Sequence, residues 1–113
     1  MMSQGLFGPV AHEGTERAKA RFLADCAGTD PRSLVLGLRA IMAFDARDRL
    51  GGVRVPALVV AGEFEGNLPD QEILHAALPD STLLAMAGTG HMAPAEDPAT
   101  FADALTRFLG QLP

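Results

Sequence analysis

The strongest indication of fold class in this chain is the segment Val55-Pro56-Ala57-Leu58-Val59-Val60-Ala61-Gly62. Its centre, residues 57–61, is apolar without polar alternation, which is typical of a strand buried on both faces in a parallel sheet flanked by helices. A short helix is predicted over residues 69–78, followed by a second strand over residues 82–86. Strand, helix and strand in this order predict a βαβ unit with a right-handed crossover.

A further helix is predicted after the second strand. Asp97-Pro98 is an N-cap and N1 pair, and apolar residues recur at helical spacing from Phe101 to Leu109 before Gly110. Residues 56–110 therefore read as β, α, β, α, which places the chain in the α/β class.

The residues before this unit predict helices and loops. Residues 1–14 have no apolar period and are expected to be irregular. One helix is expected behind a Thr15 N-cap, ending near Gly28, and a second from Asp30-Pro31 to about Phe44. Residues 45–54 have the composition of a linker. We expect two parts: an irregular and helical segment over 1–52, and the α/β unit over 53–113.

Composition narrows the functional classes. The chain has 113 residues, 48% hydrophobic, with a net charge of -5, which describes at most one globular domain. A single cysteine, Cys26, cannot form an internal disulfide framework, so a reducing compartment, the cytoplasm, is expected. No signal peptide or membrane-spanning run is visible. The acidic balance argues against nucleic acid and membrane partners, and Arg47, Arg49 and Arg54 are interpreted as a solvated linker.

Chemistry-bearing residues follow both predicted strands. Residues 62–67 contain two carboxylates, and residues 88–92 contain His91. Loops after parallel strands emerge at the same edge of a sheet, where ligands and catalytic groups gather. A carboxylate that accepts from one imidazole nitrogen leaves the other free to act as a general base. The pattern predicts half of a hydrolytic triad.

Residues 53–109 resemble the C-terminal end of an α/β-hydrolase-fold protein. Val55–Gly62 is similar to the penultimate strand of that fold, Glu65 stands where the triad acid usually lies, and Gly90-His91 resembles the histidine loop. Glu96, Pro98 and the closing helix follow the family pattern. Residues 30–50 resemble the end of the cap region in lactonase-like and haloperoxidase-like members. The resemblance implies a carboxylic ester or lactone hydrolase, with His91 and Glu65 as catalytic residues.

Two features depart from that pattern. The family carries its nucleophile in a Gly-x-Ser-x-Gly turn, whereas Ser3, Ser33 and Ser81 lie in no such turn. The half of the fold that carries the nucleophile, and the loops that build an oxyanion hole, are therefore absent from this sequence. The family also most often has Asp where this chain has Glu65, whose extra methylene shifts the carboxylate by about one C–C bond length.

Simpler interpretations stand beside these roles. His91 as a loop histidine bonded to backbone, and Glu65 as a solvated carboxylate, are the alternatives, with Glu63 and Asp70 as competing acids. Glu96 is expected to bond backbone ahead of the last helix. Other residues have no catalytic context: Cys26 is expected to be buried or half-buried, and His12 and His75 to lie at the surface. No metal site and no cofactor are predicted, because paired ligand spacings and phosphate-binding glycine motifs are lacking.

The sequence leaves more than one function open. The leading hypothesis is a C-terminal α/β-hydrolase piece that is inactive alone and acts on a small-molecule ester or lactone once completed. The runner-up is a non-enzymatic module that forms a homo-oligomer or docks on a partner chain, because an isolated two-stranded sheet is rarely stable. A truncated reading frame is the third.

Overall fold

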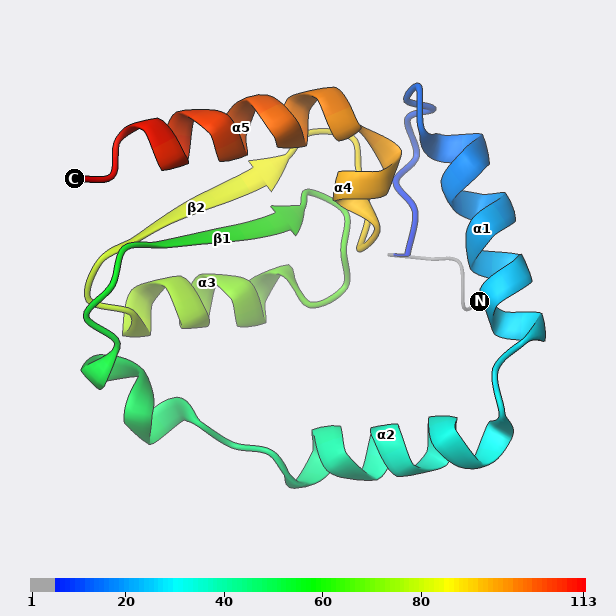
Figure 1. Ribbon diagram of the computed structural model, residues 1–113, viewed down its shortest axis with the longest axis horizontal. Helices are drawn as coiled ribbons and strands as arrows, with labels where there is room; N and C mark the ends of the chain where they lie inside the picture. The colour runs from blue at the N-terminus through cyan, green and yellow to red at the C-terminus, as the bar shows by residue number, and fades with distance from the viewer. Residues whose placement is uncertain (1–5) are drawn as a thin grey trace.

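The computed structural model describes residues 6–113 as an open α/β arrangement (Figure 1). In chain order its elements are α1 (Thr15–Ala27), α2 (Pro31–Ala43), the 3-10 helix η1 (Arg47–Gly52), β1 (Ala57–Gly62), α3 (Leu68–Ala77), β2 (Ser81–Met86), α4 (Ala93–Glu96) and α5 (Pro98–Gly110). No helix among the described residues has the length and apolar character needed to cross a bilayer.

The two strands form a parallel sheet covered by helices. Their register pairs Ala57 with Ser81 and Gly62 with Met86. Figure 1 shows α3 below the strands and α5 above them, and both helices contact the sheet. The helix α3 contacts both strands and α5 contacts β2. The predicted α/β class with two parallel strands and flanking helices is confirmed. The buried hydrophobic residues are small in number: Ala18, Val59, Ala61, Met86 and Ala93.

Two helix starts follow the predicted capping chemistry. The Asp30 carboxylate accepts a hydrogen bond from the Arg32 amide at 2.9 Å, so α2 begins at Pro31. Asp97 accepts from the Thr100 amide at 3.3 Å and caps α5 in the same way. In both cases a proline occupies the first helical position, where no amide proton is required.

The predicted Thr15 cap is wrong by one residue. Gly14 is the N-cap of α1, and Thr15 is its first helical residue. Thr15 Oγ1 instead accepts from the amide of His12 at 2.8 Å, closing the turn that precedes the helix. A Cβ on Gly14 would lie 2.1 Å from the Ala95 carbonyl oxygen, so only glycine allows the cap position to approach α4 this closely.

Cys26 is exposed, which corrects the expectation that it is buried or half-buried. The buried residues of α1, Thr15 and Ala18, lie in its first two turns, where the helix contacts α4. Figure 1 shows the C-terminal end of α1 leaving the rest of the molecule. Helical spacing predicted one apolar face for this helix, but only the start of that face is covered, and Leu23 is 67% exposed.

The helix α2 exposes its apolar residues. None of its residues is buried, and the large side chains that the sequence placed on one stripe are open to solvent: Leu34, Leu38, Ile41 and Met42. Figure 1 shows α2 along the bottom of the molecule, apart from the sheet. The segment predicted as a linker contains η1, which contacts α3.

Candidate active site

Two loops at the carboxyl edge of the sheet bring a carboxylate and an imidazole together. Glu65 lies in the loop after β1, and His91 lies in the loop after β2. Glu65 Oε1 and His91 Nδ1 are 3.5 Å apart, at the outer limit of a hydrogen bond. The two residues that the sequence singled out are 26 positions apart, and the parallel pairing of the strands makes them neighbours.

The Glu65 carboxylate is held in place by the end of its own strand. Its Oε2 accepts a hydrogen bond from the Gly62 amide at 2.7 Å. The Glu65 side chain is 4% exposed, whereas that of His91 is 59% exposed. One oxygen is thus used for anchoring, and the other is directed at the imidazole from a buried position.

This geometry assigns the tautomer of His91. A carboxylate can only accept, so the proton of the neutral ring belongs on Nδ1. Nε2 then carries the lone pair, and it makes no hydrogen bond with any residue in the range 6–113. An imidazole oriented in this way can take a proton from a hydroxyl group that approaches from the exposed side.

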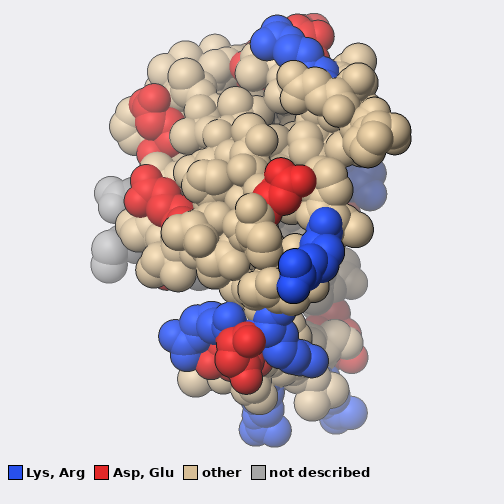
Figure 2. Space-filling model, turned by 90° about the vertical axis from the view of Figure 1, so that its left-hand side faces the viewer, with Lys and Arg blue, Asp and Glu red and all other residues tan. Residues whose placement is uncertain are grey.

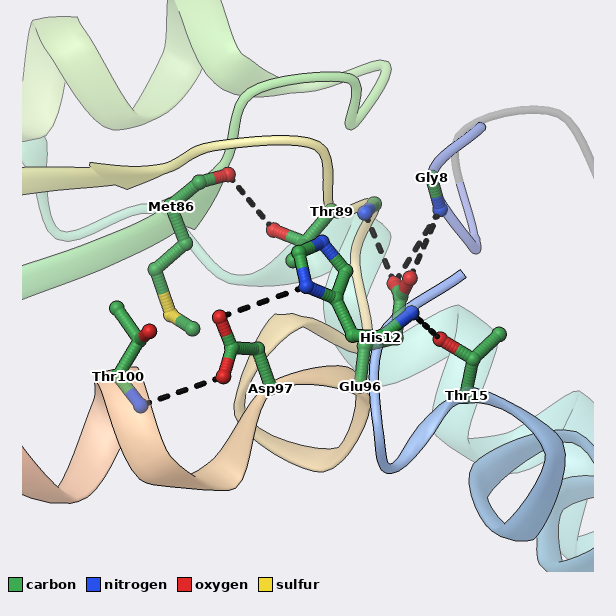
Figure 3. Close-up of polar contacts among 9 residues, drawn as sticks. Gly8, His12, Thr15, Met86, Thr89, Glu96, Asp97 and Thr100 are labelled. Atoms are coloured by element: carbon green, nitrogen blue, oxygen red, sulfur yellow. Dashed lines mark hydrogen bonds and ion pairs between the residues drawn. The ribbon is translucent and has the colours of Figure 1, made fainter. Parts of the chain in front are cut away.

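The loop that carries His91 begins with a tight turn directly after β2. Gly88 has φ +72°, the left-handed conformation that favours glycine. Thr89 is fully buried, and its hydroxyl donates to the Met86 carbonyl at 2.8 Å (Figure 3). The loop therefore leaves the strand in a direction fixed by backbone geometry and one side-chain bond.

Glu96 bonds backbone amides, as expected, but not only nearby ones. Its Oε1 accepts from the Gly90 amide at 2.9 Å. Its Oε2 accepts from the Gly8 amide at 3.1 Å, a residue 88 positions away (Figure 3). The side chain is fully buried. Sequence spacing had no means of finding the contact with Gly8.

His12 is not a free surface histidine, which corrects the expectation. Its side chain is 20% exposed, and Nδ1 lies 3.5 Å from the Asp97 carboxylate (Figure 3). Nε2 is buried and has no hydrogen-bond partner among the described residues. Hydrogen bonding from Thr100, with a smaller contribution from His12, holds the pKa of Asp97 below its ordinary value.

His75 is also partly buried and bonded rather than solvated. Its Nδ1 is 2.6 Å from the Ser81 hydroxyl, and that hydroxyl donates to the His75 carbonyl at 3.0 Å. Since the hydroxyl proton is used there, Nδ1 is the donor in the shorter contact. The pair ties the end of α3 to the start of β2, so it has a structural explanation.

No serine stands beside His91 in the described residues. Ser81 begins β2, at the edge of the sheet opposite the two loops, and Ser33 lies on the exposed helix α2. Ser3 lies outside the described residues. The acid competitors are also set apart: Glu63 and Asp70 are exposed, and the carboxylate that accepts from His91 is that of Glu65.

Hollows in the surface lie away from this pair. One of about 370 Å³ lies between α1 and the α4 region, and one of about 490 Å³ lies between the end of α2, η1 and α3. Within residues 6–113, Glu65 and His91 line neither hollow, and no group of three His, Cys, Asp or Glu side chains is placed to hold a metal ion.

Charged residues near η1 are mixed in sign. Figure 2 shows blue and red side chains gathered together at the lower end of the molecule. At the start of η1, Arg47 and Asp45 form an ion pair of 2.6 Å, and hydrogen bonding from Arg47 lowers the pKa of Asp45 to about 2. Both partners are exposed, so the pair contributes little to stability, and its opposite charges do not form a basic surface.

Comparisons with known proteins find relatives over most of this chain. It is 27% identical over 99 residues to a protein of Azorhizobium caulinodans named "Putative carbamate hydrolase RutD", and 32% identical over 97 residues to the protein of that name in Pseudomonas syringae pv. syringae. These matches cover 86% and 84% of this chain and 37% of each relative. A match of 30% identity over 105 residues to the polyketide synthase ThaQ of Burkholderia thailandensis covers 91% of this chain and 5% of that protein.

Solved structures with a similar fold also match part of this chain. Proline iminopeptidase of Mycobacterium smegmatis superposes with a TM-score of 0.57 and 32% identity, over 60% of this chain and 23% of that one. VinJ has a TM-score of 0.57 at 21% identity, over 62% of this chain and 24% of its own, which shows a likeness of fold. No protein-family model matches the chain. The chain spans little more than a third of the length of the RutD relatives.

Proposed function

This chain belongs to the α/β-hydrolase fold superfamily, and on that premise we propose that Glu65 and His91 are the acid and the base of a Ser–His–acid hydrolytic site. The observation that carries the proposal is the 3.5 Å contact between the buried Glu65 carboxylate and His91 Nδ1 at the carboxyl edge of the sheet. That edge is where α/β proteins place their catalytic groups.

In the proposed reaction His91 moves one proton in each half of the cycle. Nε2 takes the proton of a serine hydroxyl while the serine oxygen forms a bond to the carbonyl carbon of the substrate. The imidazolium then gives that proton to the leaving alcohol as the bond from carbon to that alcohol breaks. Glu65 accepts from Nδ1 throughout, so it fixes the ring and stabilises the charge. In the second half Nε2 takes a proton from water while the water oxygen bonds to the acyl carbon, and it gives that proton to the serine oxygen as the acyl–serine bond breaks.

The serine and the oxyanion donors must come from outside these 113 residues. The sequence contains no Gly-x-Ser-x-Gly turn, and a two-stranded sheet with open edges is marginal alone. The proposal therefore includes a nucleophile-bearing segment that adds strands to this sheet. The exposed apolar residues of α2 offer further area for such a contact.

The substrate class in this proposal is a carboxylic ester or a lactone. Both present a carbonyl carbon to a serine nucleophile, and the resemblance of residues 30–50 to lactonase-like members favours them. The relatives named carbamate hydrolase make a carbamate the natural comparison substrate, because it offers the same carbonyl with a nitrogen substituent.

The first experiment treats the protein from its source with a fluorophosphonate probe and measures its intact mass. A labelled species much heavier than 11.8 kDa supports the proposal and provides the enzyme for mutation. An unlabelled species of 11.8 kDa that associates with itself contradicts it, because a short chain without a nucleophile is then the native form.

In the active protein, the two residues have matched controls. His91→Ala is expected to lower kcat about a thousandfold or more, because the base is lost. Glu65→Gln is expected to lower kcat at least roughly a hundredfold through the wrong tautomer. His75→Ala and Glu63→Gln change the same residue types elsewhere and are expected to stay near the wild-type rate. Activity of His91→Ala within a few fold of wild type would refute the triad, and a loss in Glu63→Gln instead of Glu65→Gln would refute the acid.

A further inference from the structure

The peptide unit between Thr89 and Gly90, one residue before His91, is hydrogen-bonded through both its carbonyl and its amide. The Thr89 carbonyl oxygen accepts from the Phe64 amide at 2.9 Å, in the loop that carries Glu65. The Gly90 amide of the same peptide donates to Glu96 Oε1 at 2.9 Å. The plane of this peptide is thus fixed between the loop that carries Glu65 and the buried carboxylate of Glu96. The next residue along the chain is His91.

Glu96, which binds the Gly90 amide, is not a member of the proposed triad. The side chain is fully buried, and its partners are the amides of Gly90 and Gly8. No lysine, arginine or histidine among the described residues forms an ion pair with it. Hydrogen bonds from backbone amides to a carboxylate are shorter and stronger than hydrogen bonds between neutral groups. Burying a carboxylate without such bonds would be costly in free energy.

The N-terminal segment, residues 6–14, is bound to the same loop by several contacts. The Gly14 amide donates to the Glu96 carbonyl at 2.9 Å, and the Met92 amide donates to the Leu6 carbonyl at 2.9 Å. A Cβ on Gly8 would lie 1.9 Å from the Gly88 carbonyl oxygen. Glu96 therefore lies where the N-terminal segment and the histidine loop meet, and its carboxylate bonds both.

We propose that Glu96 is a positioning residue for His91: its carboxylate fixes the Thr89–Gly90 peptide and so sets the distance between the imidazole and Glu65. This inference rests on the proposed hydrolytic function. The next peptide also packs closely against the end of β1, because a Cβ on Gly62 would lie 1.9 Å from the Gly90 carbonyl oxygen. Without the Glu96 carboxylate, the Gly90 amide loses its partner and only the bond from Phe64 remains.

The test compares Glu96→Gln with Glu13→Gln. Glu13 is an exposed glutamate of the N-terminal segment and makes no hydrogen bond through its side chain to residues 6–113, so it controls for the same chemical change. In Glu96→Gln, amide hydrogen exchange at Gly90 and Gly8 is expected to speed up roughly tenfold or more, the effect of losing a charge-assisted bond. Exchange in the centre of β1 and β2 is expected to stay unchanged.

The kinetic readout is taken in the active protein. Glu96→Gln is expected to lower kcat roughly tenfold to a hundredfold with little change in KM, because misplacing the base by about an ångström has a cost of that order. Glu13→Gln is expected to match wild type. A uniform rise in exchange over the whole chain would overturn the proposal, since Glu96 would then act on global stability alone.

A measurement on the wild-type protein covers the case in which Glu96→Gln fails to fold. Scalar couplings across the hydrogen bonds, from the Gly90 and Gly8 nitrogens to the Glu96 carboxyl carbon, are expected if the carboxylate holds both amides. Their absence overturns the proposal. Normal kcat in Glu96→Gln beside an inactive His91→Ala overturns this inference alone. An active His91→Ala refutes the hydrolytic function, whatever the couplings show.

Discussion

Replacing Gly62 with alanine tests how tightly the acid and histidine loops are packed. Gly62 ends β1, donates its amide to Glu65, and faces the Gly90 peptide. An added Cβ would lie 1.9 Å from the Gly90 carbonyl oxygen and 2.8 Å from the Thr89 carbonyl oxygen. Both obstacles are backbone atoms, so no side-chain rotation can relieve the clash.

The size of the effect follows from these distances. Reaching a normal contact of about 3.5 Å requires the two loops to separate by roughly 1.6 Å. Overpacking of this kind costs typically 1–3 kcal/mol, and backbone obstacles place Gly62→Ala at about the upper limit, ~3 kcal/mol. Because Gly90 precedes His91, the same displacement would carry the imidazole out of reach of Glu65, since their 3.5 Å contact is already at the outer limit of a hydrogen bond.

The assay is urea unfolding followed by circular dichroism, with Gly66→Ala as the matched control. Gly66 lies in the same loop, and a Cβ there meets nothing within 4 Å. Gly66→Ala is therefore expected to be neutral or to stabilise by up to about 1 kcal/mol through the unfolded chain. If the free energies of unfolding of Gly62→Ala and Gly66→Ala differ by less than about 0.5 kcal/mol, the loops are not packed as described, and the geometric basis of the site is refuted.

Two further predictions concern the helix caps. The pKa of Asp97 is lowered in the fold, so its charge stabilises the protein fully above the ordinary value of 3.8, and this contribution is lost as the pH falls through the lower folded value. Asp97→Asn can still cap Thr100, but it should be less stable than wild type near neutral pH, with a difference in unfolding free energy that disappears in acid. A difference that does not depend on pH would contradict this prediction. Asp30→Ala should destabilise α2 by about 1 kcal/mol through loss of its cap. Because α2 buries no residue, hydrogen exchange should speed up within α2 while the midpoint of global unfolding stays unchanged. A shift of that midpoint would show that α2 is coupled to the core.

The elements of this fold are predicted well where the sequence carries local signals. The apolar run of β1 and the Asp-Pro starts of α2 and α5 depend on neighbouring residues, so pattern and capping chemistry were enough to place them. The pairing of Glu65 with His91 needed one further step, the parallel order of two strands. By contrast, the exposure of Cys26 and the partial burial of His12 depend on which elements meet, which periodicity does not encode.

The N-terminal segment shows where sequence reasoning stops. Residues 6–14 mix glycine, proline and isolated apolar residues without a period, and the sequence predicts only that they are irregular. In the structure Gly8 and Gly14 are required for close approach: a Cβ on either would lie about 2 Å from a carbonyl oxygen of the histidine loop or of α4. The residue that joins them to this region, Glu96, is more than 80 positions away. A buried carboxylate recognised only by backbone amides leaves no complementary side chain in the sequence, so its role is visible only once the chain is folded.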